Sequence, residues 1–380
     1  MRAITCVVAI VAVTSAGCGS DDEGGSNVQA ARSDRTVSQT DIVSDQRGAM
    51  TSDPGLVNAW GLAFNPIGAA WVSSTEEGTS NVYDAEGNAL IPPVAIPSDE
   101  EDDEGSPTGQ VYNGDEEVFE GDSFIFVTED GIIAGWQPSA GEEAVLRVDN
   151  SADDAVYKGV AIATPDDGDA RLYAADFRNA RVDVFDATYE PVTSSGFSDP
   201  DLPAGYAPFN IEAVDDHLIV TYAEQDDDKE DDVKGRGKGY VNLFDLEGNL
   251  QTRLISEGEL NAPWGAVYSP STFAAAPNKL LIGNFGDGKI HVYDVDLSEG
   301  EDAEAVYEGA LRDDSGDDVV IDGLWALEFG VAAGGFSVST LYFTAGPDDE
   351  DHGLFGSLTS ASSNGGGSTG TSGGYTTGGY

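Results

Sequence analysis

The feature that most constrains this chain is a unit that recurs six times across its central residues. Each unit opens with a short apolar segment, often Trp-Gly or a close variant, and successive openings lie 48, 50, 51, 55 and 61 residues apart. The six openings begin at Trp60, Thr108, Lys158, Phe209, Trp264 and Trp325. A repeat of this length is typical of propellers and solenoids, in which each unit covers its apolar faces with its neighbours.

Within each unit, further apolar segments follow the opening and predict short β-strands. The second segment is rich in β-branched and aromatic residues, as in Phe124–Thr128, and the third alternates apolar and polar residues, as in Arg181–Asp186. Such alternation marks strands with one buried face. A fourth strand is expected in five of the units, for example over residues 143–148 and 250–255. With 48 glycines available for turns, the chain is predicted to be all-β.

The two ends of the repeat region predict how it closes. The sixth unit has no fourth segment, because the composition turns to Gly, Ser and Thr after Leu358. A strand-like segment, Thr36–Val43, precedes the first unit and has no partner of its own. We therefore predict a six-bladed β-propeller over residues 36–359, with the last blade closed by the N-terminal strand, which removes the exposed sheet edges. Residues 360–380 are expected to form a disordered tail.

The amino terminus has the pattern of a lipoprotein signal. Arg2 precedes a short apolar run over residues 4–13, and small residues then lead to Cys18. We expect residues 1–17 to be a signal peptide, Cys18 to be acylated and residues 18–35 to be a flexible tether. The alternative is an ordinary signal peptide that is cleaved nearby. The lipoprotein interpretation places the chain in the cell envelope, on the extracytoplasmic side of a lipid bilayer.

The charge of the chain restricts its partners. There are 70 acidic and 17 basic side chains, which give a formal net charge of −53. Nucleic-acid binding needs Lys and Arg to displace counterions, so we expect no nucleic-acid partner. Two interpretations of the acidic charge remain. It keeps the chain soluble as a monomer in a salty environment, or it serves to bind cations.

Several motifs carry a resemblance to a known family. They include Leu56–Phe64, Tyr173–Asn179, Leu202–Asn210, Gly283–Gly288 and Leu341–Pro347. Over residues 43–359 the chain resembles an uncharacterised family of bacterial secreted β-propeller proteins, many of which end in a sorting segment with a Pro-Glu-Pro motif. This chain lacks that segment. More distantly, its blade pattern is similar to NHL and SMP-30/gluconolactonase propellers. These resemblances imply the fold and carry no activity with them.

The loops at one end of a propeller channel are the expected place for a site. Residues that enter the first strands or leave the second strands would supply carboxylate and amide oxygens, which suit Ca²⁺. The predicted calcium ligands are Glu129, Asp176, Asn210, Asn284 and Asp322. The alternative is that such residues cap turns through the local backbone.

An acidic loop over residues 225–232 is a second candidate for cation or partner recognition, although such runs are usually solvated. Its carboxylates are Asp226, Asp227, Asp228, Asp231 and Asp232. Three functions stay open: a membrane-tethered binding or scaffold module with Ca²⁺, a metal-dependent lactonase or esterase at the channel mouth, and a structural envelope protein. No catalytic residue is assigned, and the ligand is unknown.

Overall fold

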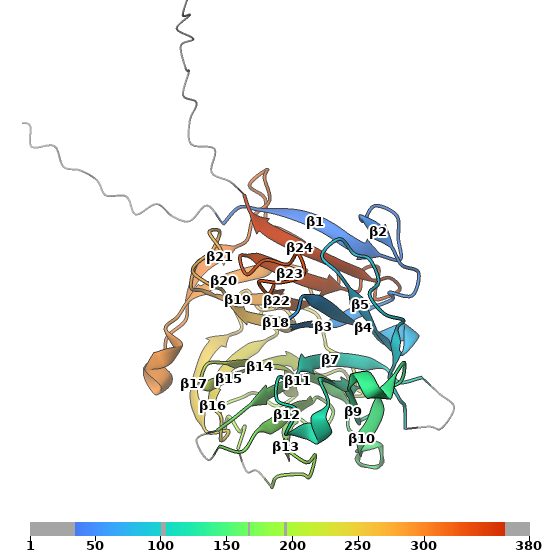
Figure 1. The fold of residues 1–380 in the computed structure, drawn as a ribbon. Coiled ribbons are helices and arrows are strands. Elements are labelled where there is room, and N and C mark those ends of the chain that lie inside the picture. The colour runs from blue at the N-terminus through green and yellow to red at the C-terminus, as the bar shows by residue number, and fades with distance from the viewer. Residues whose placement is uncertain (1–34, 100–103, 166–167, 194–195, 362–380) are drawn as a thin grey trace, which may run out of the picture. The chain divides into compact units, whose positions relative to one another are not determined.

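The computed structural model describes residues 35–99, 104–165, 168–193 and 196–361. Those residues form six antiparallel sheets around a common centre, so the predicted all-β, six-bladed propeller is confirmed (Figure 1). The predicted signal peptide, nearly all of the tether, and the tail beyond residue 361 lie outside the described residues.

Blades 1 to 3 follow one another along the chain. Blade 1 contains β3 (Ala59–Asn65), β4 (Ala69–Ser74), β5 (Thr79–Tyr83) and β6 (Val94–Ala95). Blade 2 contains β7 (Pro107–Tyr112), β8 (Phe124–Thr128), β9 (Ile132–Trp136) and β10 (Val145–Asp149). Blade 3 contains β11 (Tyr157–Ala163), β12 (Arg171–Asp176) and β13 (Arg181–Asp186).

Blades 4 to 6 complete the ring. Blade 4 contains β14 (Tyr206–Val214), β15 (His217–Glu224), β16 (Tyr240–Asp245) and β17 (Leu250–Ser256). Blade 5 contains β18 (Pro263–Tyr268), β19 (Leu280–Asn284), β20 (Ile290–Asp294) and β21 (Val306–Ala310). Blade 6 contains β22 (Leu324–Phe329), β23 (Thr340–Ala345), β24 (Leu354–Ser360) and β1 (Val37–Ser44), with the short β2 (Thr51–Ser52) parallel to β1.

The ring closes as the sequence predicts. Strand β1 pairs antiparallel with β24, from Val37 opposite Ser360 to Ser44 opposite Leu354. Figure 1 shows β1 in blue beside β24 in red. The hydroxyl of Ser44 also donates to the carbonyl of Gly353 at 2.7 Å. The N-terminal strand therefore supplies the outer strand that blade 6 lacks.

Blade 3 differs from the prediction of a fourth strand. The chain folds back after β13 far enough for the Val192 N–H to donate to the Val184 carbonyl at 2.8 Å, but no fourth strand forms among the described residues. The N–H of Phe197 donates to Gly248 of blade 4, and its ring packs against Tyr173 and Phe244. The chain thus leaves the edge of β13 to fill the core between blades 3 and 4. The other four predicted fourth strands are present.

The second strands explain why the sheets must stack. In β12, Leu172 and Ala174 belong to the apolar cluster shared with blade 2, and Tyr173 and Ala175 belong to the cluster shared with blade 4. Successive side chains of a strand point to opposite faces, so an uninterrupted apolar run needs cover on both sides. A neighbouring blade on each face provides that cover.

Candidate functional site

The channel is closed near one end by a plug of aromatic rings, which we call the aromatic plug. The rings come from the starts of the inner strands and from residues that follow β12 and β19, and they are Trp60, Phe177, Phe209, Trp264, Phe285 and Trp325. Trp325 stacks on Trp60 at 3.6 Å between ring centroids and on Phe285 at 3.8 Å. Trp60 of blade 1 also meets Trp264 of blade 5 edge-on, so the plug spans the channel. The sequence shows where the repeat units start, but only the closed ring of six blades brings their aromatic side chains together.

A buried lysine lies beside the aromatic plug. Lys158 is the second residue of β11, and its side chain is only 2% exposed. Its ammonium group forms an ion pair with Glu129, lies 3.6 Å from a carboxylate oxygen of Asp231 and lies 5.0 Å from the ring centroid of Trp60. Burial acts to lower the pKa of Lys158, but the two carboxylates outweigh that effect and hold the pKa above its ordinary value.

Two acidic loops cover this end of the channel. The loop after β15 supplies Asp231, and the loop after β23 supplies Glu350, which accepts a hydrogen bond from the side-chain amide of Asn58 at 2.8 Å. The loops face each other through Lys234 and Asp349, whose charged groups are 3.8 Å apart. We call the region around Lys158, Glu129, Asp231 and Glu350 the mouth.

Two buried carboxyl groups at the mouth hold protons more tightly than usual. Burial raises the pKa of Glu350 to about 7, with a further contribution from Glu129, while Lys158 opposes the shift. Burial also raises the pKa of Asp232 to about 6, against Lys158 and Lys234. One carboxylate oxygen of Asp232 is buried without a hydrogen-bond partner in the described structure. The mouth therefore carries negative charge that its own cations do not fully neutralise.

A pocket of about 430 Å³ extends from the mouth toward blades 2 and 3. Its charged lining consists of Asp99, Glu129, Asp130, Asp154, Arg178, Glu230 and Asp231. Arg178, the one cation among these described residues, is paired with Glu230. Burial raises the pKa of Asp130, and the neighbouring Glu129 and Asp99 add to that effect while the Ser106 N–H opposes it. We call this the acidic pocket.

Of the five predicted calcium ligands, three are engaged in hydrogen bonds at or near the ends of strands. Asp176 accepts hydrogen bonds from the backbone and side chain of Asn179, and Arg181 lies 3.3 Å away. Asn284 accepts from the Asn261 N–H at 3.1 Å and donates to the Glu259 carbonyl at 2.8 Å. Asp322 is exposed and accepts from the Asp348 N–H. Of the three, Asp176 makes the local contacts of the capping alternative, whereas these hydrogen bonds of Asn284 and Asp322 join segments that are distant in sequence.

The other two predicted ligands lie apart from each other. Glu129 belongs to the mouth, whereas Asn210 lines the channel on the far side of the aromatic plug. Among the described residues, no group of three or more His, Cys, Asp or Glu side chains is arranged to hold a metal ion. The calcium assignment for the five residues stays a prediction.

The carboxylates of the acidic loop, residues 225–232, lie in three different environments. Asp226 accepts backbone hydrogen bonds within the loop, from Glu230 at 3.1 Å and Asp231 at 3.5 Å. Asp227 and Asp228 are exposed, as the solvated alternative predicts. Asp231 and Asp232 turn toward Lys158. The part of the loop near blade 3 thus belongs to the mouth.

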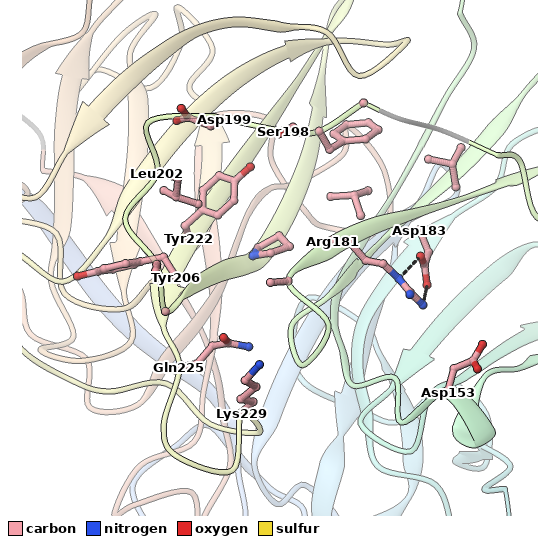
Figure 2. Close-up of a pocket in the computed structure, with 18 of the residues that line it drawn as sticks. Asp153, Arg181, Asp183, Ser198, Asp199, Leu202, Tyr206, Tyr222, Gln225 and Lys229 are labelled. Atoms are coloured by element: carbon pink, nitrogen blue, oxygen red, sulfur yellow. Dashed lines mark hydrogen bonds and ion pairs between the residues drawn. The ribbon is translucent and has the colours of Figure 1, made fainter.

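A hollow of about 710 Å³ lies between blades 3 and 4. Figure 2 shows Tyr206, Tyr222 and Leu202 on one side of it and the ion pair of Arg181 with Asp183 on the other. It forms beside β13, where blade 3 has no fourth strand in the described structure. None of the predicted calcium ligands lines it.

Lys158 and Glu350 were not among the site residues predicted from the sequence. A signal for Lys158 was present, because it occupies the repeat position at which four other units have Trp or Phe. A charged residue at such a position must find partners from other blades. Glu350 lies in a charge run that gives no sign of which carboxylate is buried.

Comparisons with known proteins place the chain in a family. No protein-family model matches it. Virginiamycin B lyase from Staphylococcus aureus superposes with a TM-score of 0.50 at 10% identity, over 85% of this chain and 99% of that one. A protein of unknown function from Bacteroides thetaiotaomicron does so with a TM-score of 0.52 at 11% identity, over 85% and 76%. At these identities the likeness shows the propeller fold alone.

Two sequence relatives come from Acanthamoeba polyphaga mimivirus. Uncharacterized protein L690 is 29% identical over 324 residues, which cover 80% of this chain and 81% of that protein. Uncharacterized protein R648 is 31% identical over 328 residues, which cover 82% of this chain and 76% of that protein. The expected kinship with bacterial secreted propellers stays a prediction. The chain belongs to the same family as protein R648 of this virus.

Proposed function

We propose that the chain is a binding module that takes cationic ligands, Ca²⁺ among them, at the mouth. The observation that carries this proposal is the acidic pocket, in which the described lining has six carboxylates and a single guanidinium that is already paired. Low-dielectric walls lined by one sign of charge concentrate counter-ions. Burial raises the pKa of Asp130, and a bound cation would relieve the repulsion that Glu129 and Asp99 add to that effect.

The proposal includes attachment to a membrane on its extracytoplasmic side, as a monomer without nucleic-acid partners. What supports it is the sequence around Cys18, which lies outside the described residues. Among the described residues, no helix is long and apolar enough to cross a membrane. The substitution Cys18→Ser should move the chain from the membrane fraction to the soluble fraction of expressing cells. Unchanged membrane association of C18S would contradict a lipid anchor at this residue.

Calcium titration of the full chain tests the binding role. The titration is done in concentrated KCl, which screens the exposed charges. The double variant D130N/D154N removes two carboxylates of the acidic pocket, and we expect it to bind Ca²⁺ about tenfold more weakly, equivalent to ~1.4 kcal/mol. The matched control is D215N/D216N, which removes the same charge from the exposed turn between β14 and β15. Equal calcium affinity in the two double variants would contradict the proposal.

A further inference from the structure

The outer edge of blade 3 lacks the strand that covers the same edge in the other five blades. The third strands of blades 1, 2, 4 and 5 pair with β6, β10, β17 and β21, and the third strand of blade 6 pairs with β1. Strand β1 comes from a distant part of the chain, so this fold already accepts an outer strand that the blade itself does not supply. In the described structure, β12 is the only strand that pairs with β13. An open strand edge of this kind is a template for pairing with another segment.

The backbone groups on that edge are only partly paired. The Val184 carbonyl accepts a hydrogen bond from the Val192 N–H at 2.8 Å, on the side away from β12. On the same side, the Asp186 N–H donates to the Glu190 carbonyl at 2.9 Å. Residues two apart in a strand direct their backbone groups to the same edge. The N–H and C=O of Val182 therefore point to the open edge, together with the Val184 N–H, and no described residue bonds them.

The open edge faces the hollow of about 710 Å³ between blades 3 and 4. Residues 181–185 of β13 line the hollow, and Leu202, Tyr206 and Tyr222 of blade 4 and its approach line the opposite side (Figure 2). These three side chains belong to the same apolar cluster as Val182, or pack against it. The volume is within the range of ligand pockets, roughly 300–1,000 Å³. The hollow therefore combines unpaired backbone groups with an apolar and aromatic wall.

The charges that line the hollow nearly cancel. Arg181 is paired with Asp183 at 2.7 Å, and Asp199 is paired with an arginine of β17 at 2.5 Å. Asp153 and Lys229 are the two charged side chains of the lining that form no ion pair with a described residue, and they have opposite signs. The acidic pocket, in contrast, has six carboxylates and one guanidinium. The hollow therefore selects neither anions nor cations and suits an uncharged segment.

We propose that this edge and hollow bind an extended peptide segment of a partner protein, which adds to β13 as its missing outer strand. Backbone hydrogen bonds to Val182 hold the segment, and its alternate side chains enter the hollow. The wall favours an uncharged segment with aromatic or β-branched side chains at alternate positions. This inference goes beyond the cation binding proposed for the mouth, because no residue lines both the hollow and the acidic pocket.

Hydrogen–deuterium exchange of the full-length protein tests the open edge. The probes are peptides selected from a random phage-displayed library against that protein. Without peptide, the Val182 amide should exchange about tenfold faster than the Asp183 amide, which points to β12. A bound peptide should slow exchange at Val182 and Val184 about tenfold and leave Asp130 of the acidic pocket unchanged. Protection of Val182 without peptide would mean that the chain itself or a second copy covers the edge, and would overturn the proposal.

Two variants with matched controls test the mode of binding. Val182→Pro removes the outward N–H without removing a bond to β12 and should weaken peptide binding about tenfold, whereas V182A keeps that N–H and should bind more tightly than V182P. Leu202→Asp places a carboxylate in the hollow and should abolish binding, whereas L90D makes the same change on the exposed surface of blade 1 and should not. If V182P does not fold, L202D against L90D decides alone. The proposal is overturned if the library yields no peptide whose affinity falls in V182P and L202D but persists in V182A and L90D.

Discussion

At the scale of single residues, one lysine offsets part of the negative charge of the mouth. Lys158 is nearly inaccessible and is surrounded by carboxylates from three different loops. A buried charge of this kind is tolerated only when partners satisfy it, and removing one member leaves the others uncompensated. The side chain also packs on Trp60, which connects the mouth to the aromatic plug. Its loss should therefore affect both charge and packing.

We predict that Lys158→Met destabilises the protein by about 3 kcal/mol at pH 8, as for a broken buried ion pair. The loss should be smaller at pH 5, because Glu350, whose pKa is about 7, can then take up a proton. Urea unfolding at both pH values measures the effect. The control K289M breaks the ion pair with Asp318 on a partly exposed surface and should cost less than about 1 kcal/mol. Equal losses for K158M at the two pH values would show that charge balance is not its role.

At the scale of elements, glycines allow the inner strands to lie close together. A Cβ atom at Gly109 of blade 2 would lie 2.9 Å from the Cα of Gly159 in blade 3. A Cβ atom at Gly159 would in turn lie 2.1 Å from Oδ1 of Asn210 in blade 4. These inner strands thus approach one another where a side chain is absent, and this narrows the channel around the aromatic plug. The spacing of the blades depends on these contacts.

Gly109→Ala is accordingly predicted to lower the free energy of unfolding by about 1–3 kcal/mol, because backbone atoms of blade 3 must move to accept the methyl group. The shift in the urea midpoint measures it. Gly114→Ala is the matched control, since its Cβ atom would meet only the ring of Tyr112 at 3.5 Å. That control should be neutral or slightly stabilising. A G109A midpoint equal to that of G114A would argue against close packing of the inner strands.

At the scale of the whole molecule, the net charge of −53 opposes compaction. Folding brings the carboxylates together: burial raises the pKa values of Glu76, Asp130 and Glu350, and repulsion from the nearby Glu129 adds to each rise. Closure by β1 and the apolar clusters between blades hold the ring together against this repulsion. The balance between the two should depend on ionic strength.

We therefore expect the melting temperature to rise by several degrees between dilute buffer and about 1 M NaCl, where the screening length shrinks to roughly 3 Å. Differential scanning calorimetry measures the change. Sucrose at matched osmolarity serves as the uncharged control and should produce a smaller rise. A melting temperature that is flat or falls with NaCl would mean that self-repulsion does not limit stability.

The sequence by itself determined the number of blades, most strands and the closure by the N-terminal strand. Those features follow from local patterns, because alternation, turn glycines and a regular repeat each act over a few neighbouring residues. The missing fourth strand of blade 3 escaped prediction because the packing of Phe197 against blade 4 outweighs local strand preference. The local capping contacts of Asp176 could also be read from its place at the end of a strand.

Only the tertiary structure decided which charged residues meet. Lys158 finds Glu129 from blade 2 and Asp231 from the loop after β15, and Lys234 of that loop meets Asp349 of the loop after β23. No local pattern encodes these pairs, because they depend on how the inner strands converge at the axis of the ring. Burial then sets their protonation, since the cost of charge depends on what surrounds a carboxyl group and not on its neighbours along the chain.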